Sequence, residues 1–182
     1  MLYIMRHGQT DWNVKHKLQG KTNISLNEFG RASSIEAGKQ YSEVNIDICY
    51  CSPLDRAQET AKLFIGDRDI PIVTDNRLEE MGFGIYEGEE KVFDKPDCPV
   101  REFFFNPGEY KAAGGAESID QVLARTGEFL NEVIYPELEK GKDILIVAHG
   151  ALNAGLLCHF RNRSKAEFWD EPMENCKLIK VL

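Results

Sequence analysis

The stretch that decides the fold is MLYIMRHG, residues 1–8 of the 182-residue chain. Its apolar residues have the length of a strand and end at Arg6 and His7. A second stretch, ILIVAHG at residues 144–150, has the same order and places His149 directly after a strand. Ligands of open parallel sheets bind at the carboxyl ends of the strands. If the two strands are parallel neighbours, both histidines lie together at that edge.

Between and after these two stretches, segments typical of strands alternate with segments typical of helices. Strands are expected at residues 1–7, 46–51, 70–74, 144–148 and 177–181. Helices are expected at about 28–41, 53–65, 99–106, 119–134 and 150–161. This alternation predicts an α/β domain with a mainly parallel sheet. Pro71 cannot donate to a strand ladder, so the strand at 70–74 is expected at an edge.

Three of these helices have clear starting signals. Asn27 is expected to be an N-cap, and Ser52 is expected to be another, with Pro53 at the first helical position. Ser118 begins a capping-box pattern before the most regular apolar stripe of the chain. Pro136 is expected to bend or end that helix.

Two connections are long enough to be functional. Residues 8–26 are polar, and loops of this length inside a compact domain usually carry function. Residues 78–116 have no clear periodicity and hold many aromatic residues, prolines and glycines. We interpret them as a small aromatic cap, with the insertion at about 84–116, on a single domain spanning 1–182.

Composition excludes several classes of protein. With 42% hydrophobic residues the chain can bury a full core, and a net charge of −8 argues against a general nucleic-acid binder. The apolar start is too short for a signal peptide, and no apolar run reaches the length of a membrane span.

The five cysteines are odd in number and form no CxxC pair, which favours reduced thiols in the cytoplasm. Cys49 and Cys51, on one strand, are expected to point to opposite faces.

Arg6 and His7 are the first candidates for chemistry. A lone histidine after a strand is usually structural, but a neighbouring guanidinium disfavours the imidazolium form and keeps the ring neutral. The same guanidinium is shaped for bidentate contact with phosphate. A neutral imidazole beside a phosphate ligand suits phosphoryl transfer through a covalent phosphohistidine.

Other side chains extend this hypothesis. Arg56 follows a strand at the start of a helix, where anions bind, although a surface arginine in a salt bridge is the alternative. Either Glu79 or Glu80 could give a proton to a leaving oxygen, and their spacing does not choose between them. His7 and His149 could instead hold a metal, but nearby arginines would repel a divalent cation. We therefore expect neither metal nor cofactor, and the chain has no P-loop pattern.

Taken together, these motifs resemble those of the histidine phosphatase superfamily, the phosphoglycerate mutase-like group. They follow the family order through nearly the whole chain. The matching segments are RHGQTDWN at 6–13, LQGKT at 18–22 with LNEFG at 26–30, SPLDRAQETA at 52–61, LEEMGFGIYEG at 78–88 and HG at 149–150. The resemblance implies a three-layer α/β/α fold.

The resemblance also implies roles for individual residues. His7 would be the nucleophile, and Glu80, rather than Glu79, would be the proton donor. The residues implied to bind the transferring phosphoryl group are Arg6, Arg56 and His149, with help from Asn13. The remaining implied substrate-binding residues are Gln19, Gly20, Lys21 and Gly150.

Departures from the family pattern bear on the substrate. Ala154 stands where the family often has arginine, Ala151 where mutases tend to have asparagine, and Tyr86 where tryptophan is usual. The chain is also shorter than the mutases, whose extra segments help to retain a bisphosphorylated intermediate. A mutase must keep water from the phosphohistidine, whereas a phosphatase must admit it. A shorter cap therefore favours a phosphatase.

We thus expect a metal-independent phosphomonoesterase that acts on a small cytosolic phosphate ester through a phosphohistidine. A phosphoglycerate mutase is the alternative, and a non-catalytic phospholigand-binding protein is a weaker third. The expected partner is a small phosphorylated metabolite, and neither a nucleic acid nor a membrane is expected. A homodimer is a possible oligomeric state. Sugar phosphates, phosphoglycerate and a nucleoside phosphate of cobamide synthesis all remain candidate substrates. The aromatic cap could favour a bulky apolar leaving group or could simply be core packing.

Overall fold

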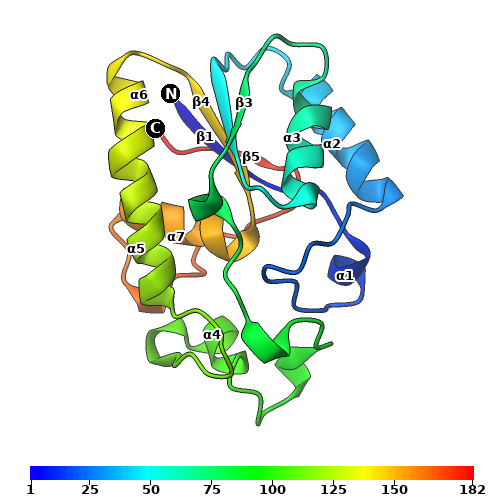
Figure 1. Cartoon of the computed structure of the whole chain (residues 1–182), viewed down its shortest axis with the longest axis vertical. Coiled ribbons are helices and arrows are strands. Elements are labelled where there is room, and N and C mark those ends of the chain that lie inside the picture. The colour runs from blue at the N-terminus through cyan, green and yellow to red at the C-terminus, as the bar shows by residue number, and fades with distance from the viewer.

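One sheet organises the molecule (Figure 1). The structure, a computed structural model, describes all residues 1–182. The strands are β1 (Leu2–Arg6), β2 (Ile48–Cys51), β3 (Ile72–Thr74), β4 (Ile144–Ala148) and β5 (Leu178–Lys180). Their order is β3-β2-β4-β1-β5, and only β5 runs antiparallel to its neighbour. The mainly parallel sheet is confirmed, and β3 lies at an edge as Pro71 indicated.

The two strands that precede the histidines are neighbours. β1 and β4 pair in parallel, from Leu2 opposite Ile144 to Arg6 opposite Ala148. The next residue, His7, continues the ladder by donating its backbone N–H to the Ala148 carbonyl at 2.9 Å. His7 and His149 therefore leave the sheet at the same edge.

Helices cover both faces of the sheet and complete a three-layer α/β/α fold (Figure 1). The helices are α1 (Asp11–Val14), α2 (Glu28–Gln40), α3 (Asp55–Ile65), α4 (Arg101–Phe105), α5 (Ile119–Phe129), α6 (Tyr135–Glu139) and α7 (Gly150–Arg161). α2 and α3 pack together on one face, and α5 and α7 pack together on the other. None of the helices combines the length and the apolar character that a membrane-spanning helix needs.

Each face has its own apolar cluster. Cys49 and Cys51 belong to the same cluster, with Ala57, Ala61 and Phe64 of α3. The expectation that the two cysteines point to opposite faces was wrong, because residues two apart on a strand share a face.

The helix starts differ from the sequence prediction at one position. Asn27 caps α2 and Ser118 forms a capping box with Gln121, as predicted. The prediction for Ser52 was wrong: α3 begins at Asp55, and its N-cap is Leu54, which makes no side-chain capping bond. The Ser52 hydroxyl instead bonds the ring of a histidine, as described below.

The predicted effect of Pro136 takes an unusual form. α5 runs into a π-helical segment, Leu130–Ile134, and α6 continues to Glu139. Proline lacks an N–H, and its ring clashes with a carbonyl of the preceding α-helical turn. A wider π turn ahead of Pro136 accommodates the ring, so the helix passes the proline instead of ending there.

The cap lies beyond the carboxyl edge of the sheet and contains α4, close to the expected short helix (Figure 1). Its centre is the fully buried Phe103, whose ring packs against Phe83, Phe104 and Tyr110. Trp169, from the C-terminal segment, also packs on Phe103 and donates its indole N–H to the Phe103 carbonyl at 2.8 Å. The cap is therefore held to the domain by an aromatic cluster.

Candidate active site

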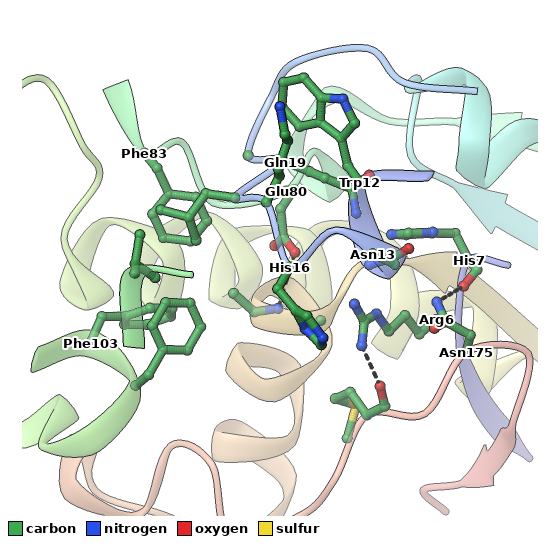
Figure 2. A pocket seen from close by; sticks show the side chains of 18 of the residues that line it. Arg6, His7, Trp12, Asn13, His16, Gln19, Glu80, Phe83, Phe103 and Asn175 are labelled. Carbon is green, nitrogen blue, oxygen red and sulfur yellow. Dashed lines mark hydrogen bonds between the residues drawn. The ribbon is translucent and has the colours of Figure 1, made fainter. Parts of the chain in front are cut away.

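A cavity of about 470 Å³ opens where β1 and β4 end. Figure 2 shows His7, Arg6 and Asn175 on one side of it and Phe83 and Phe103 on the other. The expected site residues that line the cavity are Arg6, His7, Asn13, Gln19, Gly20, Glu80 and Gly150. The polar side of the cavity comes from the sheet edge and the loop after β1, and the apolar side comes mainly from the cap.

The His7 ring is held in one tautomer. Its Nδ1 lies 2.7 Å from the Gly8 carbonyl, which can only accept, so Nδ1 carries the proton and Nε2 keeps a lone pair. Burial holds the pKa of His7 well below its usual 6.5, and the charges of Arg56 and then Arg6 lower it further. The predicted neutral imidazole thus depends first on burial and only then on the arginines. His7 is suited to act as a nucleophile through Nε2.

His149 lies beside His7, with the ring centroids 5.1 Å apart. Its Nε2 is 2.7 Å from the Ser52 hydroxyl, which itself accepts a bond from the Leu54 N–H at 3.3 Å. The buried hydroxyl has no other acceptor for its own hydrogen, so it donates to Nε2, and the proton of the neutral ring then lies on Nδ1. Burial, Arg56 and His7 lower the pKa of His149 well below 6.5, which keeps the ring neutral.

Two arginines surround the histidines. Arg6 donates through Nη1 to the Met173 carbonyl at 2.8 Å. Arg56 is fully buried and donates through Nη1 to the Thr22 carbonyl at 2.8 Å and through Nη2 to the Gly20 carbonyl at 2.7 Å. Burial lowers the pKa of Arg56 to about 10, against the opposing charge of Glu80, so both guanidiniums are cationic at neutral pH.

Three buried nitrogens of this group have no hydrogen-bond partner. They are Nε of Arg6, Nε of Arg56 and Nδ1 of His149. Buried donors are normally paired, because leaving one unpaired costs about 1–3 kcal/mol. An oxyanion bound beside His7 would supply acceptors for such donors. Arg56 and His149 are fully buried and do not line the cavity surface, although the His149 ring lies beside that of His7.

Glu80, rather than Glu79, faces the cavity. Its Oε1 accepts the backbone N–H groups of Met81 at 2.8 Å and Leu152 at 3.0 Å, and its Oε2 accepts only that of Ala151, at 3.2 Å. The first turn of α7 thus holds the carboxyl group, and Oε2 keeps the larger capacity for a ligand. Glu79 is engaged elsewhere, in an ion pair with Lys21.

The expected substrate-binding residues divide into two groups. The side-chain oxygens of Asn13 and Gln19 lie 3.1 and 3.0 Å from the Thr10 hydroxyl, whose single hydrogen can go to either of them, so the amide N–H groups of both residues remain available at the cavity. Lys21 does not line the cavity, because its Nζ lies 3.2 Å from Glu79 and 4.0 Å from Glu117. The structure thus does not bring Lys21 to the site.

Several lining residues escaped the sequence analysis. Asn175 donates its side-chain N–H to the His7 carbonyl at 2.6 Å, and the Met173 carbonyl holds Arg6. Both come from an irregular segment more than 160 residues after β1, where no pattern marks them. His16 and Lys17 lie at the polar mouth, between the matched segments at 6–13 and 18–22, where no motif marks them.

The site offers no obvious metal centre. No group of three or more histidine, cysteine, aspartate or glutamate side chains converges anywhere in the structure. The charge available beside His7 comes from the two guanidiniums, Arg6 and Arg56, which favour an anion over a cation.

Comparisons with known proteins bear on the family to which the chain belongs. A family model described as "Histidine phosphatase superfamily (branch 1)" matches residues 2–182. A relative in Gloeobacter violaceus, "2,3-bisphosphoglycerate-dependent phosphoglycerate mutase 2", is 30% identical over 97% of this chain and 82% of its own length. "Uncharacterized phosphatase PhoE" of Bacillus subtilis is 35% identical over 85% of this chain and 74% of its own.

The solved structures include "Bacillus stearothermophilus YhfR", which matches with a TM-score of 0.87 and 30% identity over 97% of this chain and 88% of that one. The relatives carry the names of both mutases and phosphatases, and the match extends through the cap as well as the sheet. The chain belongs to branch 1 of the histidine phosphatase superfamily.

Proposed function

We propose that the protein hydrolyses small phosphate monoesters through a phosphohistidine formed on His7. The observation that carries the proposal is the state of that ring: its Nδ1 proton is held by the Gly8 carbonyl, and burial keeps the ring neutral. The lone pair of Nε2 is therefore available at neutral pH, in a site where three buried N–H donors lack partners.

In the first step, Nε2 of His7 attacks phosphorus and the bond from phosphorus to the ester oxygen breaks. Arg6, Arg56 and His149 donate to the oxygens of the transferring group and stabilise the charge that they carry in the transition state. Glu80, through Oε2, gives a proton to the leaving oxygen, so the product departs as a neutral alcohol.

In the second step, water attacks the phosphohistidine. The Glu80 carboxylate accepts a proton from that water as it attacks, the bond from phosphorus to Nε2 breaks, and inorganic phosphate leaves. The Glu80 carboxyl and the His7 ring return to their starting states, so the cycle balances without a metal or a further reactant.

The wall opposite His7 suits an ester with an apolar part. Phe83, Phe93, Phe103 and Phe104 line the cavity beside Trp169. An aromatic or alkyl leaving group would bury apolar surface there, at about 25 cal/mol per Å².

We also propose a cytoplasmic location, which the five free cysteines support.

Mutase activity is the second candidate, and the names of several relatives favour it. A mutase returns the phosphoryl group to a second hydroxyl of the substrate, whereas a phosphatase gives it to water. Interconversion of 2- and 3-phosphoglycerate that exceeds release of inorganic phosphate would identify a mutase. We expect release of inorganic phosphate to exceed this interconversion.

The test is a phosphatase assay in the presence of a chelator, on p-nitrophenyl phosphate and a panel of phosphorylated metabolites. The wild type is expected to release phosphate and, when quenched, to carry an acid-labile phosphoryl group. The His7→Ala variant should lose both, and His159→Gln, changed at an exposed histidine outside the cavity, should keep both. Full turnover by His7→Ala would contradict the proposal.

A further inference from the structure

Glu87 connects the cap to the loop at residues 20–22. Its Oε1 accepts the backbone N–H groups of Phe83 and Lys21, each at 3.0 Å. Its Oε2 accepts the N–H of Thr22 at 2.9 Å and the Thr22 hydroxyl. One carboxylate thus receives four hydrogen bonds, one from the cap entrance and three from the loop.

The same loop holds Arg56 through its carbonyl groups. The Gly20 and Thr22 carbonyls accept from the two terminal nitrogens of the guanidinium, at 2.7 and 2.8 Å. The loop therefore turns its N–H groups to Glu87 and its carbonyl groups to Arg56. The Gly20 carbonyl and the Lys21 N–H belong to one planar peptide group, so rotation of that peptide away from Glu87 would also move a carbonyl that holds Arg56.

The contact between Glu87 and the loop depends on a glycine. Gly20 has φ +52, and a Cβ at this position would lie 2.1 Å from Oε1 of Glu87. Only glycine allows both this backbone conformation and this approach of the carboxylate. The sequence thus supplies a matched pair, Gly20 and Glu87, although neither was assigned this role from the family pattern.

We propose that Glu87 is a positioning residue for Arg56: it fixes the loop at 20–22 so that the guanidinium is held at the phosphoryl site. The inference rests on the proposed function only in taking Arg56 as a ligand of the transferring phosphoryl group. Glu87 itself does not line the cavity, so it acts through the loop. Since Glu87 lies in the cap, a displacement of the cap would be transmitted to Arg56.

The variant that tests this is Glu87→Gln. An amide places a donor where one carboxylate oxygen accepted, so it loses bonds to the loop while it keeps the size of the side chain. Glu117→Gln is the matched control, because Glu117 also accepts a backbone N–H near the cap, that of Gly82 at 2.7 Å, without bonding the backbone of residues 20–22.

The first readout is a double-mutant cycle with Arg56→Lys. Glu87→Gln is expected to lower kcat/KM by about tenfold in the wild type, the equivalent of one hydrogen bond, and by less than about twofold when Arg56 is already lysine. Glu117→Gln should have the same small effect in both backgrounds. Equal losses for Glu87→Gln in the two backgrounds would overturn the proposal.

The second readout does not need turnover. The 15N–1H signal of the Arg56 Nε group should shift or broaden in Glu87→Gln and stay in place in Glu117→Gln. An unchanged signal would overturn the positioning role even if the enzyme is active. If the wild type shows no phosphatase activity but the signal still shifts in Glu87→Gln, only the proposed function is refuted. If Glu87→Gln does not fold, Thr22→Val, which removes one donor to Glu87, should shift the same signal, and no shift would overturn the proposal.

Discussion

Acidification below pH 6.5 should destabilise the folded protein because two of its histidines are held neutral. Burial first, and then the charge of Arg56, keeps the pKa values of His7 and His149 well below 6.5 in the folded state. In the unfolded chain both rings take up protons near pH 6.5. Stability is therefore fully present above that pH and is lost as the pH falls from 6.5 towards the folded-state pKa values.

The size of the effect follows from proton linkage. At pH 5.5, one unit below the unfolded pKa, protonation stabilises the unfolded state by about 1.4 kcal/mol for each histidine that stays neutral when folded. His7 and His149 together should then cost about 3 kcal/mol. That is a large part of the free energy of unfolding of a typical domain, which is roughly 5–15 kcal/mol.

The assay is urea unfolding at pH 7.5, 6.5 and 5.5 for the wild type, His7→Gln, His149→Gln and the double variant. Carboxylates titrate in all four proteins, so their contribution cancels in the differences. Each single variant should lose about 1.4 kcal/mol less than the wild type between pH 7.5 and 5.5, and the double variant about 3 kcal/mol less. If all four curves have the same pH dependence, the rings are protonated inside the folded protein and the argument for a neutral nucleophile fails.

Three substitutions test other parts of the site and fold. Ser52→Ala should lower kcat by about tenfold, because the Nε2 atom of His149 loses the partner that fixes its tautomer, and 15N signals of that ring should report mixed tautomers. Glu80→Gln should lower kcat/KM, which reports formation of the phosphohistidine, by about 10²–10⁴ for an alkyl phosphate and by much less for p-nitrophenyl phosphate, whose leaving group needs no proton, whereas Glu79→Gln should change little; the opposite ranking would exchange their roles. Phe103→Ala should cost about 3–5 kcal/mol in urea unfolding, since its ring is fully buried at the centre of the cap, and a loss below about 1 kcal/mol would show that the cap is not tightly packed.

The sequence was sufficient where local pattern and sheet geometry agree. The apolar runs before His7 and His149 predicted two strands of one mainly parallel sheet, and the condition that they be neighbours is met, because β1 and β4 are paired in the structure. The aromatic segment predicted a cap, and α4 lies within it. These features follow from hydrophobic periodicity and from the rule that parallel strands present their carboxyl ends together.

The sequence was insufficient where a side chain chooses between two partners. Ser52 has the pattern of an N-cap, yet its hydroxyl bonds His149, which lies 97 residues away. Lys21 has the position of a substrate ligand, yet it pairs with Glu79. Asn175 holds the His7 carbonyl from an irregular segment near the C-terminus. Such choices depend on tertiary distances, which no local pattern contains.

The two ends of the cavity belong to parts of the molecule with different resistance to opening. His7 and His149 extend from β1 and β4, each of which has a strand on both sides, whereas Phe93, Phe103 and Phe104 of the aromatic wall belong to an insertion built of short helices and turns. Peripheral units of this kind open at lower free energy than a central sheet. Mutations among the aromatic residues of the insertion, away from Glu87, can therefore alter which molecules fit the cavity while His7 and His149 keep their positions, which gives a lineage with this architecture a route to new ligands.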